Sequence, residues 1–280
     1  MATFAIAVPS YNQAQFLDEC ISSIASQSYR NFYLAVGDGG SSDGSAAIIE
    51  KWKHLLQQWY SEPDGGQAAA VNRLWRALPG EWLAWLNSDD YYLPGAFQAV
   101  ADSIAQHPEV RLVVGNCAIV DREGRQTAVK NTHRCTLQYL LSGRSLPQPA
   151  VFFHRSVIDN MRPLDESLRY ALDWELLVRY VQSLSANTIL RLNVTLAASR
   201  EYEGTKSSTG LGEKAQERLK VVENAQLSDA LRRKARAGVG YVWALDEWRY
   251  GSRVRALAVF WRFKCWNAAF LVWRILAKRK

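Results

Sequence analysis

Short apolar runs alternate with segments of helical periodicity over residues 1–115. The apolar runs predict strands at 3–8, 32–37, 59–61, 82–86 and 111–114. Between them, apolar residues recur every three or four positions, which predicts helices at 15–26, 45–52, 68–77 and 96–106. Strands that alternate with helices of about ten residues form right-handed βαβ units around a mostly parallel sheet. The pattern therefore predicts an α/β fold of the doubly wound kind.

The pattern changes twice further along the chain. A polar stretch at 121–148 predicts turns, after which a strand is expected at 150–154, a helix at 173–184 and strands within 188–197. From residue 207 onward the periodicity is helical. We therefore expect an α/β domain at 1–205 and a helical region at 206–280.

Charge divides the chain at the same point. Residues 1–205 carry 17 Lys and Arg against 21 Asp and Glu, whereas residues 206–280 carry 17 against 6. No acid follows Glu247, and tryptophan and phenylalanine recur there among nine basic residues. The opposite electrostatic characters indicate that the two regions have different roles.

Cysteine spacing and the first residues bear on the compartment. The four cysteines are far apart, with no spacing typical of a zinc site or a disulfide framework. The first apolar run is not preceded by a charged stretch and is not followed by a cleavage signal. We therefore expect no secretory signal peptide. Both features favour a cytoplasmic location.

Polar and glycine-rich residues follow each of the first four predicted strands, at 9–12, 37–44, 62–67 and 87–90. Turns favour such residues anyway. In an open α/β sheet, however, ligands bind outside the carboxyl ends of the strands. Four polar loops in succession therefore predict one shared binding site at that edge.

Two of these loops suggest particular chemistry. The run 37–44 matches neither GxGxxG nor GxxxxGK[ST], and its acids would repel a phosphate, so we expect Asp38 to accept hydrogen bonds from a base or ribose. In the tetrad 87–90, the carboxylates of Asp89 and Asp90 suit Mg²⁺ or Mn²⁺ held against a diphosphate. A turn followed by a helix cap is the structural alternative.

Five motifs stand out along the chain: PSYNQAQFLDECISSIASQSY, VGDGGSSDGS, SEPDGGQAAAVN, WLNSDD and QPAVFF…LDESLRYALDWELLVRY. Together they resemble the family 2 inverting glycosyltransferases with the GT-A fold, of the bacterial surface-polysaccharide type that includes lipopolysaccharide assembly. They occur in the family's order and spacing over roughly residues 3–205. The resemblance implies a Rossmann-like GT-A domain that transfers a sugar from a nucleotide-diphosphate donor. The expected donor is a UDP-sugar.

The resemblance also implies roles for individual residues. Asp89 would contact a divalent metal, with Asp90 as a second candidate, and Asp173 would be the base on the acceptor side. The residues expected to bind the donor are Pro9, Tyr11, Asp38, Asp64, Gln67, Asn72, Ser88 and Asp89.

The chemistry of inversion is consistent with these roles. A single displacement needs one base to take the acceptor proton, and a metal to neutralise charge on the departing diphosphate. Asp173 opens a predicted helix after a polar loop, Trp174 beside it could stack on a sugar ring, and Glu175 is the nearest rival base. An ordinary helix cap is the structural alternative for Asp173.

The sequence departs from the family pattern at two positions. Asn87 stands where many members have the first acid of the DxD element, and Tyr202 stands where relatives often carry a histidine. An amide and a phenol are poorer metal ligands than carboxylate or imidazole, which weakens the expectation of tight metal binding. Arg200 and Lys206 could balance the diphosphate charge or be solvated surface.

Segment 253–280 is apolar, aromatic and basic. In a bilayer centre Arg262, Lys264 and Arg274 would cost up to roughly 7–10 kcal/mol, against about 3–5 kcal/mol gained from the apolar residues. We therefore expect the segment to lie on the membrane surface, at the inner face of the cell membrane, near a glycan or polyprenyl-linked acceptor. Docking on its own domain and a homodimer interface stay open. Nucleic-acid binding is disfavoured.

Two other functions compete with glycosyl transfer. A glycoside hydrolase also needs two carboxylates and aromatic residues, but it gives no reason for four polar loops at strand ends. A non-catalytic nucleotide-sugar binder or assembly scaffold would explain Asn87 and Tyr202.

Overall fold

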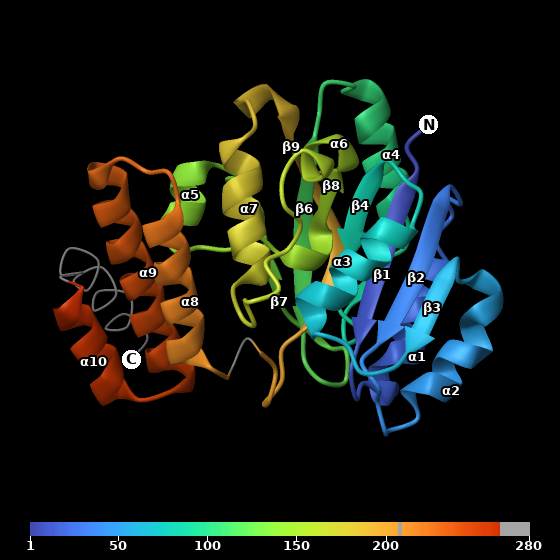
Figure 1. Cartoon of the computed structure of the whole chain (residues 1–280), viewed down its shortest axis with the longest axis horizontal. Coiled ribbons are helices and arrows are strands. Elements are labelled where there is room, and N and C mark those ends of the chain that lie inside the picture. The colour runs from blue at the N-terminus through green and yellow to red at the C-terminus, as the bar shows by residue number, and fades with distance from the viewer. Residues whose placement is uncertain (207–208, 264–280) are drawn as a thin grey trace. The chain divides into compact units, whose positions relative to one another are not determined.

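The computed structural model describes residues 1–206 and 209–263 (Figure 1). The chain divides into two compact units. The first comprises Met1–Cys135 and Leu146–Glu201, and the second comprises Thr136–Ser145 and the chain from Tyr202 onward. The segment Thr136–Ser145 therefore belongs with the helices that follow the α/β part of the chain.

In the described part of the first unit, nine strands form one sheet in the order β3-β2-β1-β4-β8-β6-β9-β5, with β7 paired to β6. The strands are β1 (Phe4–Ser10), β2 (Phe32–Asp38), β3 (Gln58–Ser61), β4 (Trp82–Trp85), β5 (Tyr91–Tyr92), β6 (Leu112–Val120), β7 (Gln126–Lys130), β8 (Val151–His154) and β9 (Ile189–Arg200).

Strand direction differs between the two halves of the sheet. β1 pairs in parallel with β2 and β4, and β2 pairs in parallel with β3, as expected. β8 is antiparallel to both β4 and β6, and β5 is antiparallel to β9. An α-helix of the first unit precedes β2, β3, β4, β6 and β9 and returns the chain to the same edge, whereas only a three-residue 3₁₀ turn of that unit directly precedes β8. The α/β class is confirmed, with a mixed rather than mostly parallel second half.

Helices cover both faces of this sheet. In the first unit they are α1 (Ala14–Ala25), α2 (Ser45–Trp52), α3 (Gln67–Ala77), α4 (Ala96–Gln106), α6 (Arg155–Asp159) and α7 (Leu172–Gln182), with 3₁₀ turns at Lys53–Leu55, Gln148–Ala150 and Ala186–Thr188. The second unit contains α5 (Leu137–Leu141), α8 (Leu211–Asn224), α9 (Asp229–Tyr250) and α10 (Arg253–Arg262). Within the described ranges, none of these helices combines the length and hydrophobicity that a membrane crossing demands.

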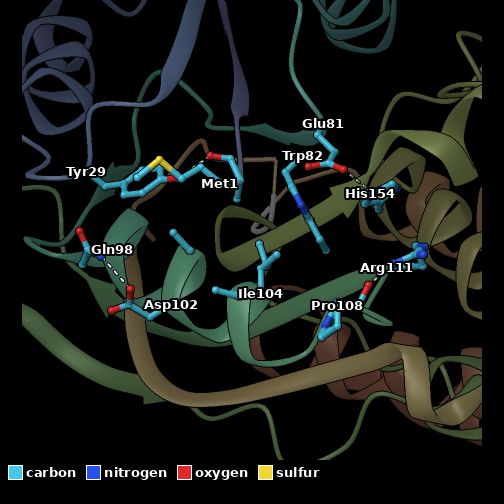
Figure 2. A pocket seen from close by; sticks show the side chains of 13 residues that line it. Met1, Tyr29, Glu81, Trp82, Gln98, Asp102, Ile104, Pro108, Arg111 and His154 are labelled. Carbon is cyan, nitrogen blue, oxygen red and sulfur yellow. Dashed lines mark hydrogen bonds and ion pairs between the residues drawn. The ribbon is translucent and has the colours of Figure 1, made fainter.

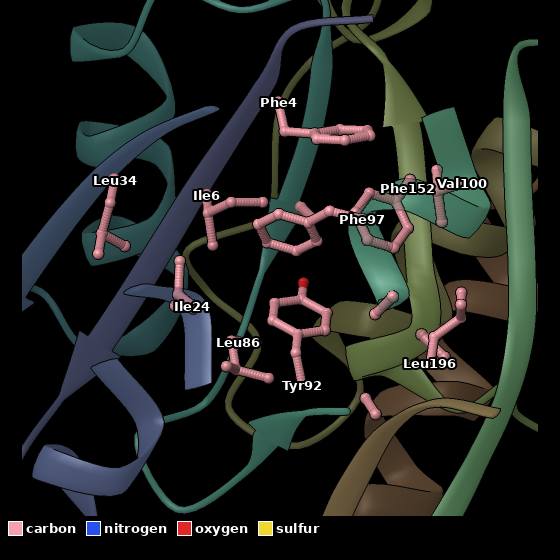
Figure 3. Packing of buried hydrophobic residues seen from close by; sticks show 14 of the residues in the cluster. Phe4, Ile6, Ile24, Leu34, Leu86, Tyr92, Phe97, Val100, Phe152 and Leu196 are labelled. Carbon is pink, nitrogen blue, oxygen red and sulfur yellow. The ribbon is translucent and has the colours of Figure 1, made fainter. Parts of the chain in front are cut away.

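The core of the first unit follows from alternation along the strands. On one face, the ring of Phe4 lies 5.3 Å from Phe97 of α4 and 5.4 Å from Phe152 of β8 (Figure 3). On the other face, Trp75 of α3 packs edge-on to Trp85 of β4 at 5.4 Å. Because helices bury both faces, the edges where strands end are the places left for chemistry.

The stretch predicted as turns, 121–148, contains β7 and α5. β7 is exposed along its whole length. Its residues therefore do not alternate between apolar and polar, and the sequence shows no strand pattern there. α5 is only five residues long, and the side chain of Thr136 caps it by accepting the Tyr139 N–H. The expected helices at 45–52 and 96–106 are confirmed in full.

Candidate active site

The loops after β1, β2 and β3 start at one level of the sheet. Ser10 lies opposite Asp38, and Asp38 lies opposite Ser61, at the carboxyl ends of these three parallel strands. The loop after β4 starts beside them, since β4 runs parallel to β1. The predicted site therefore has its four loops along one edge of the sheet, which we call the carboxyl edge.

Hydrogen bonds tie the first loop to the second. The Asn12 N–H donates to Ser41 Oγ at 2.7 Å, and the Ser42 N–H donates to Asn12 Oδ1 at 3.0 Å. The Ala14 N–H donates to Asp43 Oδ2 at 2.8 Å. Asn12 has a φ of 51°, in the left-handed region that a non-glycine residue adopts at a cost. The two loops thus form one braced unit.

Asp38 is fully buried and its carboxylate is engaged by the loop itself. It accepts hydrogen bonds from the Ser41 N–H at 3.0 Å, from the Ser61 hydroxyl at 2.7 Å and from the Ser41 hydroxyl. The expectation that Asp38 contacts a base or ribose directly is therefore corrected. With no exposed surface, Asp38 instead fixes the conformation of residues 39–41.

Tyr11, Gly39 and Asp64 converge at the same place. A Cβ placed on Gly39 would lie 3.4 Å from Tyr11 Cδ2 and 3.4 Å from Asp64 Oδ1. Tyr11 is 64% exposed, so its ring is available to a ligand. Asp64 is held by the Gly66 N–H at 2.8 Å and the Tyr60 hydroxyl at 3.2 Å. Glycine at 39 leaves open the space between an aromatic ring and a carboxylate.

The third and fourth loops are joined through side-chain amides. Gln67 Nε2 donates to Asn87 Oδ1 at 2.7 Å, and Asn87 Nδ2 donates to Asp90 Oδ2 at 3.4 Å. Asn87, which departs from the expected acid, therefore serves as a bridge between loops. The four loops form one continuous edge, as the sequence predicts.

Asp89 and Asp90 are not equivalent. Asp90 is 2% exposed, and its Oδ1 accepts the Arg200 N–H at 2.9 Å. Burial, and next the charge of Asp89, raise the pKa of the Asp90 carboxyl well above its ordinary value. Asp90 is thus an interior group that ties β9 to the fourth loop, which corrects its proposed role as a second metal ligand. Asp89 is partly exposed.

Arg200 supports Asp89 instead of facing a diphosphate. Its side chain is 4% exposed and ion-pairs with Glu19 at 2.5 Å, while Nη1 donates to the Asp89 carbonyl at 2.7 Å. The guanidinium lies 4.6 Å from the ring centroid of Phe16 and 5.1 Å from that of Tyr91. The expected balancing of diphosphate charge by Arg200 is corrected, because the group is enclosed by protein.

The direction of α7 places Asp173 at the carboxyl edge. At the far end of this helix, the Tyr180 hydroxyl donates to the carbonyls of Arg111, at 2.7 Å, and His154, at 3.0 Å. Arg111 directly precedes β6 and His154 pairs with Trp82, the first residue of β4, so Tyr180 marks the opposite edge. Figure 1 shows α7 running beside the sheet with its first turn at the end where the β1 and β2 arrows point. Asp173 is partly exposed there.

The two neighbours of Asp173 are excluded from the roles expected of them. Trp174 is fully buried, so it offers no face to a sugar ring. Glu175 is 5% exposed and forms ion pairs with Arg162 at 3.0 Å and Arg179 at 2.7 Å. Both carboxylate oxygens of Glu175 are therefore occupied by guanidiniums inside the protein. Asp173 is therefore the candidate base that remains on α7.

Asn72 is a structural residue and not a donor-binding one. It is 2% exposed, its Nδ2 donates to the Leu164 carbonyl and to Glu166 Oε1, both at 2.9 Å, and its Oδ1 accepts the Leu164 N–H at 3.0 Å. These three side-chain hydrogen bonds all go to the segment that precedes α7. Asn72 thus fixes that segment against α3.

The contacts described do not test the roles of four further predicted residues. Pro9 is a buried residue of β1, and Ser88 is 4% exposed between Asn87 and Asp89. Tyr202 and Lys206 belong to the second unit. Their predicted roles stay predictions.

Gln148 is a polar residue at this edge that the sequence reasoning missed. Its Nε2 donates to the Trp85 carbonyl at the end of β4, at 2.7 Å. Its Oε1 is buried and has no partner among the described residues. Gln148 is the first residue of the QPAVFF motif, three positions before β8.

The donor set for a metal at this edge is small. Among residues 1–206 and 209–263, no group of three or more His, Cys, Asp or Glu side chains could hold a metal ion. With Asp90 buried, Asp89 is the carboxylate of the fourth loop that a cation could reach. One carboxylate fits a Mg²⁺ or Mn²⁺ ion that takes its other ligands from a diphosphate and water.

A separate cavity of about 430 Å³ lies at the opposite edge, beside Met1 and the first residue of β4, Trp82 (Figure 2). Two polar pairs line it: Glu81 with His154 at 3.4 Å, and Gln98 with Asp102 at 2.7 Å. None of the residues predicted for the active site contributes to this cavity.

Comparison with known proteins shows which sequence family this chain matches. The family model described as "Glycosyl transferase family 2" matches residues 5–161. A PGL/p-HBAD biosynthesis glycosyltransferase of Mycobacterium tuberculosis is 28% identical over 209 residues, which cover 73% of this chain and 79% of the relative. An uncharacterized glycosyltransferase of Rickettsia typhi is 25% identical over 221 residues, covering 74% of this chain and 67% of the relative.

Two solved structures share the fold. S. aureus TarS 1–349 in complex with UDP-GlcNAc superposes with a TM-score of 0.67 at 20% identity, over 89% of this chain and 73% of that one. The mannosyltransferase PcManGT from Pyrobaculum calidifontis, in complex with GDP-Man and Mn²⁺, gives 0.63 at 15% identity, over 97% of this chain and 85% of that one. The GT-A fold expected from the resemblance is confirmed.

Proposed function

Because the chain belongs to glycosyl transferase family 2 and is a glycosyltransferase, we propose that it transfers a sugar from a nucleoside-diphosphate donor to an acceptor hydroxyl with inversion. The observation that carries this proposal is the continuous carboxyl edge, where four loops are hydrogen-bonded to one another. UDP is the proposed nucleotide, supported by the UDP-GlcNAc complex of a protein with the same fold.

The donor would bind across the first three loops. The exposed ring of Tyr11 offers a face on which a base stacks, and Asp64 offers a carboxylate to the base or the ribose. Gly39 keeps the space between them open. The braces from Asn12 to Ser41 and from Ser61 to Asp38 hold these groups in place before the donor arrives, which lowers the entropy cost of binding.

Asp89 would hold a divalent cation on the diphosphate. Bound there, Mn²⁺ or Mg²⁺ supplies positive charge to the leaving diphosphate. The chain's own contribution is to position Asp89, which Arg200 does by binding the Asp89 carbonyl while Asp90 binds the Arg200 N–H. The Mn²⁺ in the PcManGT complex supports a metal-dependent reaction.

Asp173 would act as the general base. In an inverting displacement the acceptor oxygen forms a bond to the anomeric carbon as the bond from that carbon to the diphosphate oxygen breaks. The acceptor proton passes to the Asp173 carboxylate on the face opposite the leaving group. Asp173 suits this step because it is partly exposed at the first turn of α7, whereas Glu175 is held by two arginines.

The acceptor we propose is a glycan or a polyprenyl-linked glycan at the inner face of the cell membrane. The acceptor would approach from α7 and the segment that Asn72 holds in place. The two competing functions are less well supported. A glycoside hydrolase and a non-catalytic scaffold both fit poorly with a family of transferases.

A thermal-shift screen tests the donor. The full chain is heated with UDP, GDP and their common sugars, with and without Mn²⁺, and a UDP-sugar is expected to raise the melting temperature most in the presence of the metal. Tyr11→Ala should remove that shift, whereas Tyr33→Ala, which truncates another exposed tyrosine in β2, should leave it unchanged. A shift by no nucleotide sugar contradicts the proposal.

A further inference from the structure

Helix α10 is packed on one side and exposed on the other. Ala256, Val259 and Phe260 are buried, and Val259 and Phe260 form a small core with Ala244 and with Tyr241 and Trp243 of α9. This packed side fixes the rotation of α10 about its own axis. The residues on the opposite side of the helix must therefore face away from α9.

That opposite side is apolar. Val254 is 77% exposed, Leu257 is 54% exposed and Trp261 is 67% exposed. Their spacing of three and four residues places them in one line along the helix. Single exposed apolar residues are ordinary on protein surfaces, but three in line form a stripe. We call Val254, Leu257 and Trp261 the α10 stripe.

Arginines border the α10 stripe. At about 100° per residue, Arg253 falls on one side of it, and Arg255 and Arg262 fall on the other. The Arg253 guanidinium lies 5.4 Å from the ring centroid of Trp248, and that of Arg262 lies 5.6 Å from Phe263. An arginine beside apolar residues can pack the aliphatic part of its side chain against an apolar layer while its guanidinium contacts anions.

The nearby acids of α9 are neutralised. Glu247 is 4% exposed and binds Arg255 Nε at 3.1 Å and the Ser252 N–H at 3.2 Å. Asp246 pairs with Lys214 at 2.7 Å, and both side chains are largely buried. α10 itself contains no acid. Nothing on α10 therefore repels an anionic surface.

We infer that α10 lies flat on an anionic membrane surface, with the α10 stripe entering the headgroup region and Arg253 and Arg262 on lipid phosphates. A surface that is apolar in the middle and cationic along both borders matches a lipid headgroup layer better than a protein groove. The inference uses only residues of the second unit, so it does not depend on the proposed function. Of the segment 253–280 expected at the membrane, residues 264–280 lie outside the described residues.

Vesicle flotation of the full chain tests the inference. The native chain should float with phosphatidylcholine vesicles that contain phosphatidylglycerol, and much less with phosphatidylcholine alone. Leu257→Glu and Trp261→Glu should each weaken binding by about tenfold or more. Arg253→Gln and Arg262→Gln should each weaken it by roughly fivefold, since a cation near an anionic surface contributes about 1 kcal/mol. Val194→Glu, at a 44% exposed position on β9, is the matched control and should bind as the native chain does.

Three outcomes would overturn the inference. They are a native chain that does not float with anionic vesicles, a Leu257→Glu variant that floats as well as the native chain, and a Val194→Glu control that is equally impaired. If light scattering instead shows that Leu257→Glu halves the particle mass while vesicle binding is unchanged, the stripe joins two copies of the chain. The thermal shift with UDP-sugars, measured on the same variants, separates a failure here from a failure of the proposed function.

Discussion

The two edges of the first unit's sheet use polar residues in different ways. At the carboxyl edge, side chains bond from loop to loop, as Asn12 does to Ser41 and Gln67 does to Asn87. At the opposite, amino edge, polar residues pair with a neighbour around a cavity of about 430 Å³, as Glu81 does with His154. The cavity that the structure shows is therefore at the amino edge and not among the four loops. We therefore place the proposed chemistry at the carboxyl edge, where hydrogen bonds between the loops hold the polar groups in position.

Burial sorts the polar residues of the carboxyl edge into two groups. Asp38, Asn72 and Asp90 are at most 2% exposed, and their side chains form hydrogen bonds with other groups of the protein. Tyr11 and Asp89 retain exposed surface beside them. The buried group sets the positions of the exposed group, which is how a site is held ready before its ligand binds. The predictions below test this division, and they use the amino edge as the control.

The largest effect is expected from Asp173→Asn. An amide cannot take the acceptor proton, so turnover should fall by about 10²–10⁴-fold. The thermal shift with the donor should stay as in the native chain, since the fold and the donor loops are untouched. Glu81→Gln removes a carboxylate from the amino edge and should leave turnover unchanged. Equal losses in the two variants would mean that the edges do not differ.

The next largest effect separates two adjacent acids. Asp89→Asn should lower kcat/KM by roughly 100-fold, because a bound divalent ion contributes several kcal/mol to such reactions. Asp90→Asn should retain most of the activity, because the amide has the same shape and its oxygen can still accept the Arg200 N–H. Steady-state assays across a Mn²⁺ titration measure both. A greater loss in Asp90→Asn would reverse the assignment of the metal-contacting acid.

Much of this division could not be predicted from the sequence. The strand ends, and hence the shared edge, follow from alternating apolar runs, because a βαβ chain returns its loops to one side. The roles of Trp174 and Asn72 do not follow from the sequence pattern, because tryptophan and asparagine occur both in protein cores and in binding sites. Only packing shows that Trp174 is fully buried and that Asn72 binds Leu164. Glu19 and Gln148 were missed because their partners, Arg200 and Trp85, are distant in the sequence.

A stability difference is expected from Asn72→Ala. The change leaves the N–H and the carbonyl of Leu164 without partners in a buried place, which should lower the free energy of unfolding by about 1–3 kcal/mol. Gln98→Ala at the amino edge removes one exposed hydrogen bond to Asp102. This change should alter the free energy of unfolding by no more than about 0.5 kcal/mol. Urea denaturation measures both variants. A native-like Asn72→Ala variant that has lost donor binding would return Asn72 to the donor site.

The smallest effect concerns pH at the amino edge. Burial, and next the charge of Arg111, lower the pKa of His154 from its ordinary value of 6.5, while Glu81 acts in the opposite direction. The folded chain then binds a proton at His154 less readily than the unfolded chain. The contribution of His154 to stability is therefore lost as pH falls through about 6.5 toward the lowered value.

His154→Gln should accordingly make the free energy of unfolding less dependent on pH between about 7 and 5. Glu81→Gln should make it more dependent, because it removes the partner that favours the imidazolium. Denaturant unfolding at several pH values measures the two slopes, and equal slopes would show that the Glu81–His154 pair does not titrate as the geometry indicates. Turnover should be the same in both variants, because neither side chain belongs to the carboxyl edge. A change in turnover would link the cavity to the chemistry and remove the contrast between the two edges.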